Sequence, residues 1–374
     1  MEQKKTLYPI KFIPATEQHR WGKETHMIAD LGTVDTEAGN GWLAGNTISD
    51  IMETYIERVV GEDVYNYYGR QFPVSVSVLD IDGDMPVACH PDDESAGQRY
   101  DALGKNTLWY ILEASGNAMI YFGFKNGMSA TELYERCLDG SIRDALTPVK
   151  PGKGDWLNIR PGTVYSASGR LRILSISEAS AITFILHDPD GKPEDSHVED
   201  AIDLIDYMPA DMDTYHRATA SLQPGILLSS PEFTVARMEV HEPAKVTSGH
   251  SFTIYSCIGG GLAVQTAAKD DRWEEHTESY PLADGETMLV PADIDEFFLV
   301  PTGRDTVVLE TIVEKREEVD GYIDPDTEPF LEGEDYGGAE DGDTDDDIEA
   351  DGDDRQESSG KNAGGAADIR RFFN

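Results

Sequence analysis

The sequence predicts a mainly β protein built from two antiparallel sandwiches or barrels. Many segments are short, rich in Val, Ile and aromatic residues, and separated by Gly, Asp or Pro, which is typical of strands joined by turns. A helical segment near the middle separates a first set of these segments from a second, so two β units are expected. The regular alternation of strands and helices that indicates a parallel doubly wound sheet is not seen.

The first half is predicted to begin with a helix and to continue with strands. Apolar residues recur at helical spacings of three and four within residues 44–61, at Ile48, Ile51, Met52, Tyr55, Ile56 and Val59. Strand-like segments follow at residues 72–80, 117–124, 154–159, 170–177 and 181–188. Ser129 and Glu132 have the spacing of a capping box, which predicts a helix over 129–138 between two of these strands.

The second half begins after a further helix predicted over residues 195–208. Its strand-like segments are residues 233–240, 250–265, 286–291, 296–302 and 305–313. The residues from Glu317 onward differ in composition from both halves, with 21 acidic and 4 basic side chains and few apolar ones. Such a segment cannot bury enough apolar surface to fold, so it is predicted to be a disordered acidic tail.

Composition excludes several classes of function. The formal net charge of −42 argues against nucleic-acid binding, because phosphate backbones are bound by clustered Lys and Arg. An anionic substrate would need a local cation at its site. No apolar run is long enough to span a membrane and no secretory signal is evident, so a cytoplasmic protein without membrane association is expected. Cys89, Cys137 and Cys257 are too scattered for a disulfide framework or a clustered zinc site.

A single histidine stands at a sharply marked strand end. Residues 87–90 have the character of a strand, and Pro91 with the acidic residues after it ends that strand. Strand alternation places Ala88 and His90 on one face and Cys89 on the other, where the thiol is expected to pack in the wall. His90 is then either a hydrogen-bonded histidine at a sheet edge or a ligand.

Several segments taken together resemble the short bacterial form of the type I mannose-6-phosphate isomerases, also called phosphomannose isomerases. They occur in the family's order, at residues 8–12 with Trp21 and Gly22, and at residues 43–55, 72–94, 104–112, 150–169 and 197–207. The likeness covers residues 7–312. It implies two cupin-type jelly rolls, or double-stranded β-helices, and an isomerase of carbohydrate metabolism that interconverts mannose 6-phosphate and fructose 6-phosphate with zinc.

Most of the zinc ligands that the resemblance implies are replaced in this sequence. His90 matches the family's first histidine, whereas Ala88 stands at the glutamine position, Thr107 at the glutamate position and Tyr165 at the second histidine position. A methyl group and a neutral hydroxyl are poor zinc donors, and a tyrosine binds well only as phenolate. Zinc is therefore expected to be absent or weakly bound. Asp92, Asp93 and His187 leave a rebuilt site open, although turn carboxylates are more often solvated caps.

The substrate positions implied by the resemblance have changed in the same way. Ile185 stands at the position of the family's arginine and Ser77 at that of a lysine. Lys105 is retained at a substrate-contacting position, and a single lysine can still pair with a phosphate. A hexose phosphate is thus the expected small-molecule partner, and no catalytic residue is assigned.

The predicted organisation has four parts. Residues 1–190 form an N-terminal segment and the first jelly roll, and residues 191–222 a helical connector. Residues 223–316 form the second jelly roll, and residues 317–374 the tail.

Three hypotheses about function follow. The preferred one is a non-catalytic paralogue, a pseudoenzyme that binds a sugar phosphate or acts in regulation. The alternatives are an active metal-dependent isomerase with substitute ligands, and an interaction protein acting through its C-terminal peptide. In that peptide, residues 368–374, Ile369, Phe372 and Phe373 share one face of a helical turn and resemble sliding-clamp-binding peptides, although Ala366 replaces their glutamine.

Overall fold

The structure of the protein is a computed structural model that describes residues 5–192, 196–218, 224–269 and 275–313. The described residues belong to one compact unit, Met1–Asp324. The predicted disordered tail and its peptide, residues 317–374, lie outside the described residues. The four-part division of the chain stays a prediction.

The first half of the chain contains most of the helices. Its strands are β1 (Phe12–Ile13), β2 (Ala15–His19), β3 (Gly22–Ile28), β4 (Glu37–Ala38), β5 (Val74–Asp84), β6 (Val87–Cys89), β7 (Thr107–Ala114), β8 (Met119–Phe124), β9 (Leu146–Val149), β10 (Trp156–Ile159), β11 (Tyr165–Glu178), β12 (Phe184–His187) and β13 (Tyr215–His216). Its helices are η1 (Gly41–Leu43), α1 (Ile48–Val60), α2 (Glu62–Tyr68), α3 (Asp93–Tyr100), α4 (Ala130–Asp139), α5 (Ile142–Ala145), α6 (Val198–Ala201) and η3 (Met212–Thr214).

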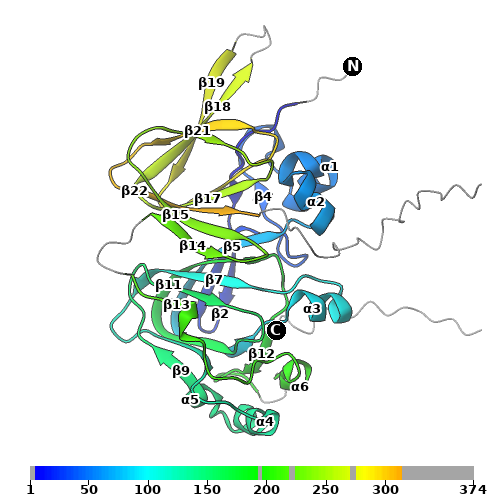
Figure 1. Cartoon of the computed structure of the whole chain (residues 1–374), viewed down its shortest axis with the longest axis vertical. Helices are drawn as coiled ribbons and strands as arrows, with labels where there is room; N and C mark the ends of the chain where they lie inside the picture. The colour runs from blue at the N-terminus through cyan, green and yellow to red at the C-terminus, as the bar shows by residue number, and fades with distance from the viewer. Residues whose placement is uncertain (1–4, 193–195, 219–223, 270–274, 314–374) are drawn as a thin grey trace, which may run out of the picture. The chain divides into compact units, whose positions relative to one another are not determined.

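The second half consists of strands alone in its described part. They are β14 (Gly225–Ser229), β15 (Thr234–Val240), β16 (Ala244–Thr247), β17 (Thr253–Gly259), β18 (Gly261–Lys269), β19 (Glu275–Ala283), β20 (Thr287–Val290), β21 (Glu296–Pro301) and β22 (Thr306–Ile312). Figure 1 shows most of these strands above β5, β7 and β11 of the first half. The mainly β, cupin-type fold expected from the sequence is confirmed.

Strand β11 organises the first barrel. Along its C-terminal part it pairs with β5 on one side and β7 on the other, and its N-terminal residues pair with β6 and β8. One long strand thus contributes to both walls of the barrel. The interior is filled at one end by an apolar cluster that includes Leu79, Ile81, Trp109, Ile111 and Ile173.

The second barrel is formed by two antiparallel sheets. One has the strand order β14-β15-β22-β17-β20 and the other the order β16-β21-β18-β19. Its core includes Tyr255, Leu262, Phe297 and Val308. The predicted strand over residues 250–265 is two strands, because the chain turns at Gly260, whose φ of 73° suits glycine.

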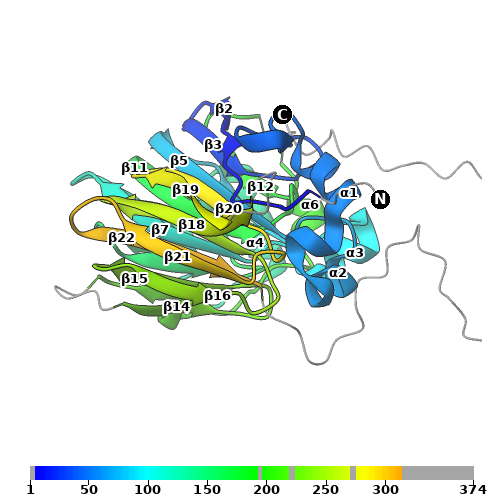
Figure 2. The same ribbon diagram turned by 90° about the horizontal axis from the view of Figure 1, so that it is seen from above.

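The two barrels share a hydrophobic core. A single cluster joins Val76 and Leu174 of the first barrel to Ile254 and Leu309 of the second, and the helices α1 and α2 cover it. Figure 2 shows both helices on one flank of the stacked sheets. At the end of α1, Gly61 has a φ of 93°, and a Cβ there would lie 2.0 Å from the carbonyl oxygen of His250.

Two predicted helices are confirmed. Helix α1 begins after Thr47, whose hydroxyl accepts from the N–H of Asp50 while the Asp50 carboxylate accepts from the N–H of Thr47. Helix α4 begins after Ser129, whose hydroxyl accepts from the N–H of Glu132. Local capping chemistry fixes both helix starts. None of the described helices combines the length and apolar character that a membrane crossing requires.

The helix predicted over residues 195–208 is wrong for most of its length. Among the described residues of this range, 196–208, only Val198–Ala201 are helical. The chain then turns, because the N–H of Asp206 bonds to the carbonyl of Gly162 in the first barrel instead of continuing a helix. Conversely, the acidic turn after His90 starts a helix. The Asp92 side chain accepts from the N–H of Ser95 and caps α3.

Candidate functional site

The candidate site lies where β6, β11 and β12 meet in the first barrel. Ala88 of β6 is paired with Tyr165 of β11 on one side and with Ile185 of β12 on the other. His90 follows β6 directly, before Pro91 ends the extended segment. These pairings bring together three of the positions that matched functional residues of the family.

Both ring nitrogens of His90 are engaged. Its Nδ1 lies 3.2 Å from the carbonyl oxygen of Ile182, which can only accept, so Nδ1 carries the proton. The hydroxyl of Tyr165 lies 2.9 Å from Nε2 and donates to it. The Nε2 lone pair, which a metal would need, is therefore used by a hydrogen bond within the chain.

Burial keeps this pair neutral. Desolvation lowers the pKa of His90 well below its usual value, and the charge of Lys105 lowers it further. Desolvation raises the pKa of Tyr165, and the nearby Cys89 and Glu24 add to the rise. At neutral pH a neutral imidazole thus accepts from a neutral phenol, so Tyr165 offers no phenolate to a metal, and His90, with its lone pair engaged and its pKa lowered, is a weak base.

Thr107 occupies the first position of β7, between Ile159 of β10 and Ser177 of β11. Its side chain is buried, and its hydroxyl has no hydrogen-bond partner among the described residues. An unpaired buried hydroxyl costs about 1–3 kcal/mol. The wall of the barrel therefore keeps a polar group whose hydrogen bond a ligand could supply.

Lys105 is held beside this wall. Its N–H bonds to the carbonyl of Pro91 at 3.0 Å, which ties it to the segment that carries His90. Burial lowers the pKa of its ammonium group, while the carboxylate of Glu24 raises it. Lys105 thus places a cation near the His90 imidazole, and the carboxylate of Glu24 is close enough to interact with the same cation.

Residues of β3 that the sequence analysis did not single out contribute to the same region. Glu24 accepts from the hydroxyl of Ser77 at 2.6 Å, and His26 lies directly across from Ser77 in the sheet. His26 is buried, with its Nε2 at 3.1 Å from Glu17. The sequence feature that could have pointed to these residues is the alternation of Glu24 and His26 within an otherwise mixed segment. The same alternation is typical of an edge strand, so it did not single them out as site residues.

Cys89 does not take part. It is fully buried beside His90, and burial raises the pKa of its thiol. A protonated, desolvated thiol is a poor metal ligand and a poor nucleophile.

The side chains at this site do not fit zinc. The four positions that matched the family's ligands offer a methyl group, an unpaired hydroxyl, a neutral phenol and an imidazole whose lone pair already accepts a hydrogen bond. Zinc sites use three or four nitrogen, sulfur or carboxylate donors. Within the described ranges, the group of metal-ligating side chains that comes together lies elsewhere and consists of Asp93, Glu178 and Glu232.

Comparisons with known proteins agree with this architecture. The family model of the mannose-6-phosphate isomerase cupin domain matches residues 226–309. The mannose-6-phosphate isomerase ManA of Bacillus subtilis is 26% identical over 320 residues, covering 79% of this chain and 96% of the relative. The mannose-6-phosphate isomerase of Streptococcus mutans is 26% identical over 229 residues, covering 60% and 69%.

Solved structures show the same fold. The mannose 6-phosphate isomerase from Bacillus subtilis superimposes with a TM-score of 0.67 at 22% identity, covering 81% of this chain and 99% of that structure. The fold and the position of the site define a two-barrel protein of the cupin superfamily. The sequence matches are to mannose-6-phosphate isomerases, over residues 226–309 for the family model and over 79% of this chain for the Bacillus subtilis relative.

Proposed function

We propose that this chain is a non-catalytic member of the mannose-6-phosphate isomerase family and that its first barrel binds a sugar phosphate without zinc. The observation that carries the proposal is the hydrogen bond from the Tyr165 hydroxyl to Nε2 of His90. This bond takes the lone pair of the one remaining family ligand. With that lone pair occupied and its pKa lowered, the imidazole provides neither a ligand for a Lewis-acid metal nor an effective base for moving a proton between sugar carbons.

Lys105 is the group proposed to bind the phosphate. It is the cation beside His90, and the unpaired hydroxyl of Thr107 offers a hydrogen bond to a polar ligand. Ile185, which stands at the family's arginine position, supplies no second cation. A single ammonium group without an arginine fork supports modest affinity for the phosphate.

Three measurements on the full chain test the proposal. We expect no zinc after metal analysis of protein purified without chelator, and no conversion of mannose 6-phosphate in an assay coupled to fructose 6-phosphate. We expect mannose 6-phosphate or fructose 6-phosphate to raise the melting temperature, because a ligand at 100 times its Kd stabilises by about 2.7 kcal/mol. Lys105→Met should abolish that rise, and Lys150→Met, at an exposed position, should keep it.

The active-isomerase alternative makes the opposite prediction. It requires stoichiometric zinc and a turnover that His90→Ala removes. Stoichiometric zinc together with a turnover that His90→Ala removes would overturn the non-catalytic assignment. A melting temperature unchanged by both hexose phosphates would overturn the sugar-phosphate assignment while leaving the absence of catalysis standing.

A further inference from the structure

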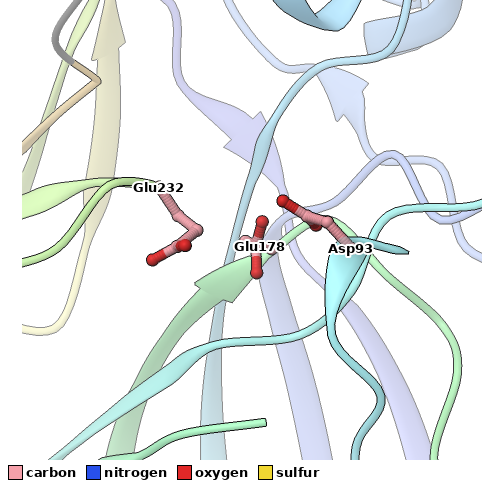
Figure 3. A group of neighbouring side chains, drawn as sticks. All are labelled: Asp93, Glu178 and Glu232. Carbon is pink, nitrogen blue, oxygen red and sulfur yellow. The ribbon is translucent and has the colours of Figure 1, made fainter. Parts of the chain in front are cut away.

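Three carboxylates meet at the seam between the two barrels. Glu178 ends β11, Asp93 begins α3, and Glu232 lies in the turn between β14 and β15 of the second barrel. Oxygen atoms of the three side chains lie within 4.8 Å of one another. Figure 3 shows Glu178 between Asp93 and Glu232.

The central carboxylate is deeply buried. Glu178 is 1% exposed, and its Oε2 accepts from the N–H of Asn106 at 2.8 Å, while its Oε1 has no hydrogen-bond donor among the described residues. Asp93 accepts from the N–H of Gly104 at 2.9 Å. These bonds fix the positions of two carboxyl groups in a site shielded from water, where burial, together with Asp93 and Glu232, raises the pKa of Glu178.

The neutral side chain of Asn106 is an independent sign that a ligand belongs beside these carboxylates. Asn106 is 5% exposed, and its Nδ2 donates to Glu232 at 2.9 Å, so the amide is directed into the group of carboxylates. Its carbonyl oxygen is buried and accepts no hydrogen bond from the described residues. Buried carbonyl oxygens without a donor are rare, and oxygen ligands of this kind are those that hard cations prefer.

We infer that Asp93, Glu178 and Glu232, with the carbonyl oxygen of Asn106, bind a hard divalent cation such as Ca²⁺ or Mg²⁺. The donors are all oxygen atoms, so the site differs in chemistry from a zinc site of histidine and thiolate ligands. Because Glu232 belongs to the second barrel and the other donors to the first, the cation joins the two barrels.

The experiment uses the full chain, treated with EDTA and then dialysed free of metal. Its melting temperature is measured with CaCl₂, MgCl₂ or MnCl₂ against NaCl of equal ionic strength. We expect at least one divalent cation to raise the melting temperature by about 3–6 °C at saturation. Glu178→Gln should abolish the rise, and Glu53→Gln, at an exposed position of α1, should keep it.

A second variant, Glu232→Gln, is included in case Glu178→Gln fails to fold. Loss of the cation effect in both variants supports the site. A shift that persists in both variants assigns the effect to other acidic residues and overturns the inference. The inference is also overturned if none of the three cations stabilises the unmodified chain, which would mean that a proton shared between Glu178 and Asp93 neutralises the cluster.

Discussion

His90 shows how one side chain can be retained while its chemistry changes. The histidine stands at the position that the family resemblance assigns to a metal ligand, and Tyr165 donates to the nitrogen that a metal would bind. Sequence alone identified both positions and their neighbour Ala88. It could not predict the hydrogen bond, because the bond depends on the rotamers of two residues 75 positions apart in the chain.

Tyr165→Phe tests the energetic role of this bond. Removing the hydroxyl leaves the buried Nε2 of His90 without a donor, so we expect the free energy of unfolding to fall by about 1–3 kcal/mol in urea denaturation. Tyr134→Phe is the matched control, since its hydroxyl makes only a long, exposed contact with Glu199 at 3.4 Å. Equal losses in the two variants would contradict a special contribution from the His90 partner.

Restoring the lost donors tests why zinc does not fit. We expect the triple variant Ala88→Gln, Thr107→Glu and Tyr165→His to bind about one zinc ion per chain, measured by metal analysis after purification, because it recreates a four-donor site with His90. The same triple variant with His90→Ala should bind less. If the triple variant folds yet takes up no zinc, the barrel wall itself has moved away from a metal-binding geometry.

At the scale of elements, local signals predicted the helices that begin at strong caps. Helix α1 was predicted from its apolar spacing, and Thr47 and Asp50 complete its capping box. The helix over residues 195–208 was wrong because Asp206 bonds to Gly162, a tertiary contact that no local pattern contains. The acidic group was missed for the same reason, since Asp93, Glu178 and Glu232 come from three distant segments.

Thr47→Ala tests the cap of α1. The substitution removes the acceptor of the Asp50 N–H, so we expect a loss of about 1 kcal/mol in the free energy of unfolding. Thr47→Ser keeps a hydroxyl and should cost much less. A negligible effect of Thr47→Ala would mean that burial of the α1 face, rather than its cap, holds the first turn.

Asp30, in the segment between β3 and β4, makes stability depend on pH. Burial raises the pKa of its carboxyl to about 6, the N–H of Phe72 lowers it, and Asp35 raises it. The folded chain therefore holds this proton more tightly than the unfolded chain, so its contribution is present below about pH 4 and is lost as pH rises through about 6. We expect Asp30→Asn to stabilise the protein at pH 7, by roughly 1–3 kcal/mol, and not at pH 4.

Unfolding midpoints of the two proteins across pH 4–8 provide the measurement. Asp35→Asn, which removes the charged neighbour but keeps the Asp30 carboxyl, should reduce the pH dependence only in part. Parallel pH profiles for the unmodified chain and Asp30→Asn would contradict the assignment of this titration to Asp30.

At the scale of the whole molecule, two β units were predicted but their common core was not. The sequence divides near its middle, yet residues of both barrels belong to one hydrophobic cluster covered by α1 and α2. Close packing extends to the backbone, since Gly61 leaves no room for a Cβ beside His250. Composition and periodicity indicate which residues are buried but not which barrel buries them.

Phe252→Ala tests whether the two barrels unfold together. The ring of Phe252, from the second half of the chain, lies 4.9 Å from that of Phe72, from the first half, and both side chains are fully buried. Truncation of such a ring costs about 3–5 kcal/mol. Because the cluster is shared, we expect calorimetry to show one transition shifted to lower temperature as a whole, with hydrogen exchange faster in strands of both barrels.

Phe298→Ala is the control. Its ring is 46% exposed, so the substitution should change stability by less than about 0.5 kcal/mol. Two separated transitions in Phe252→Ala, with the first barrel's exchange unchanged, would show instead that each barrel is stable alone and that the shared core only docks them.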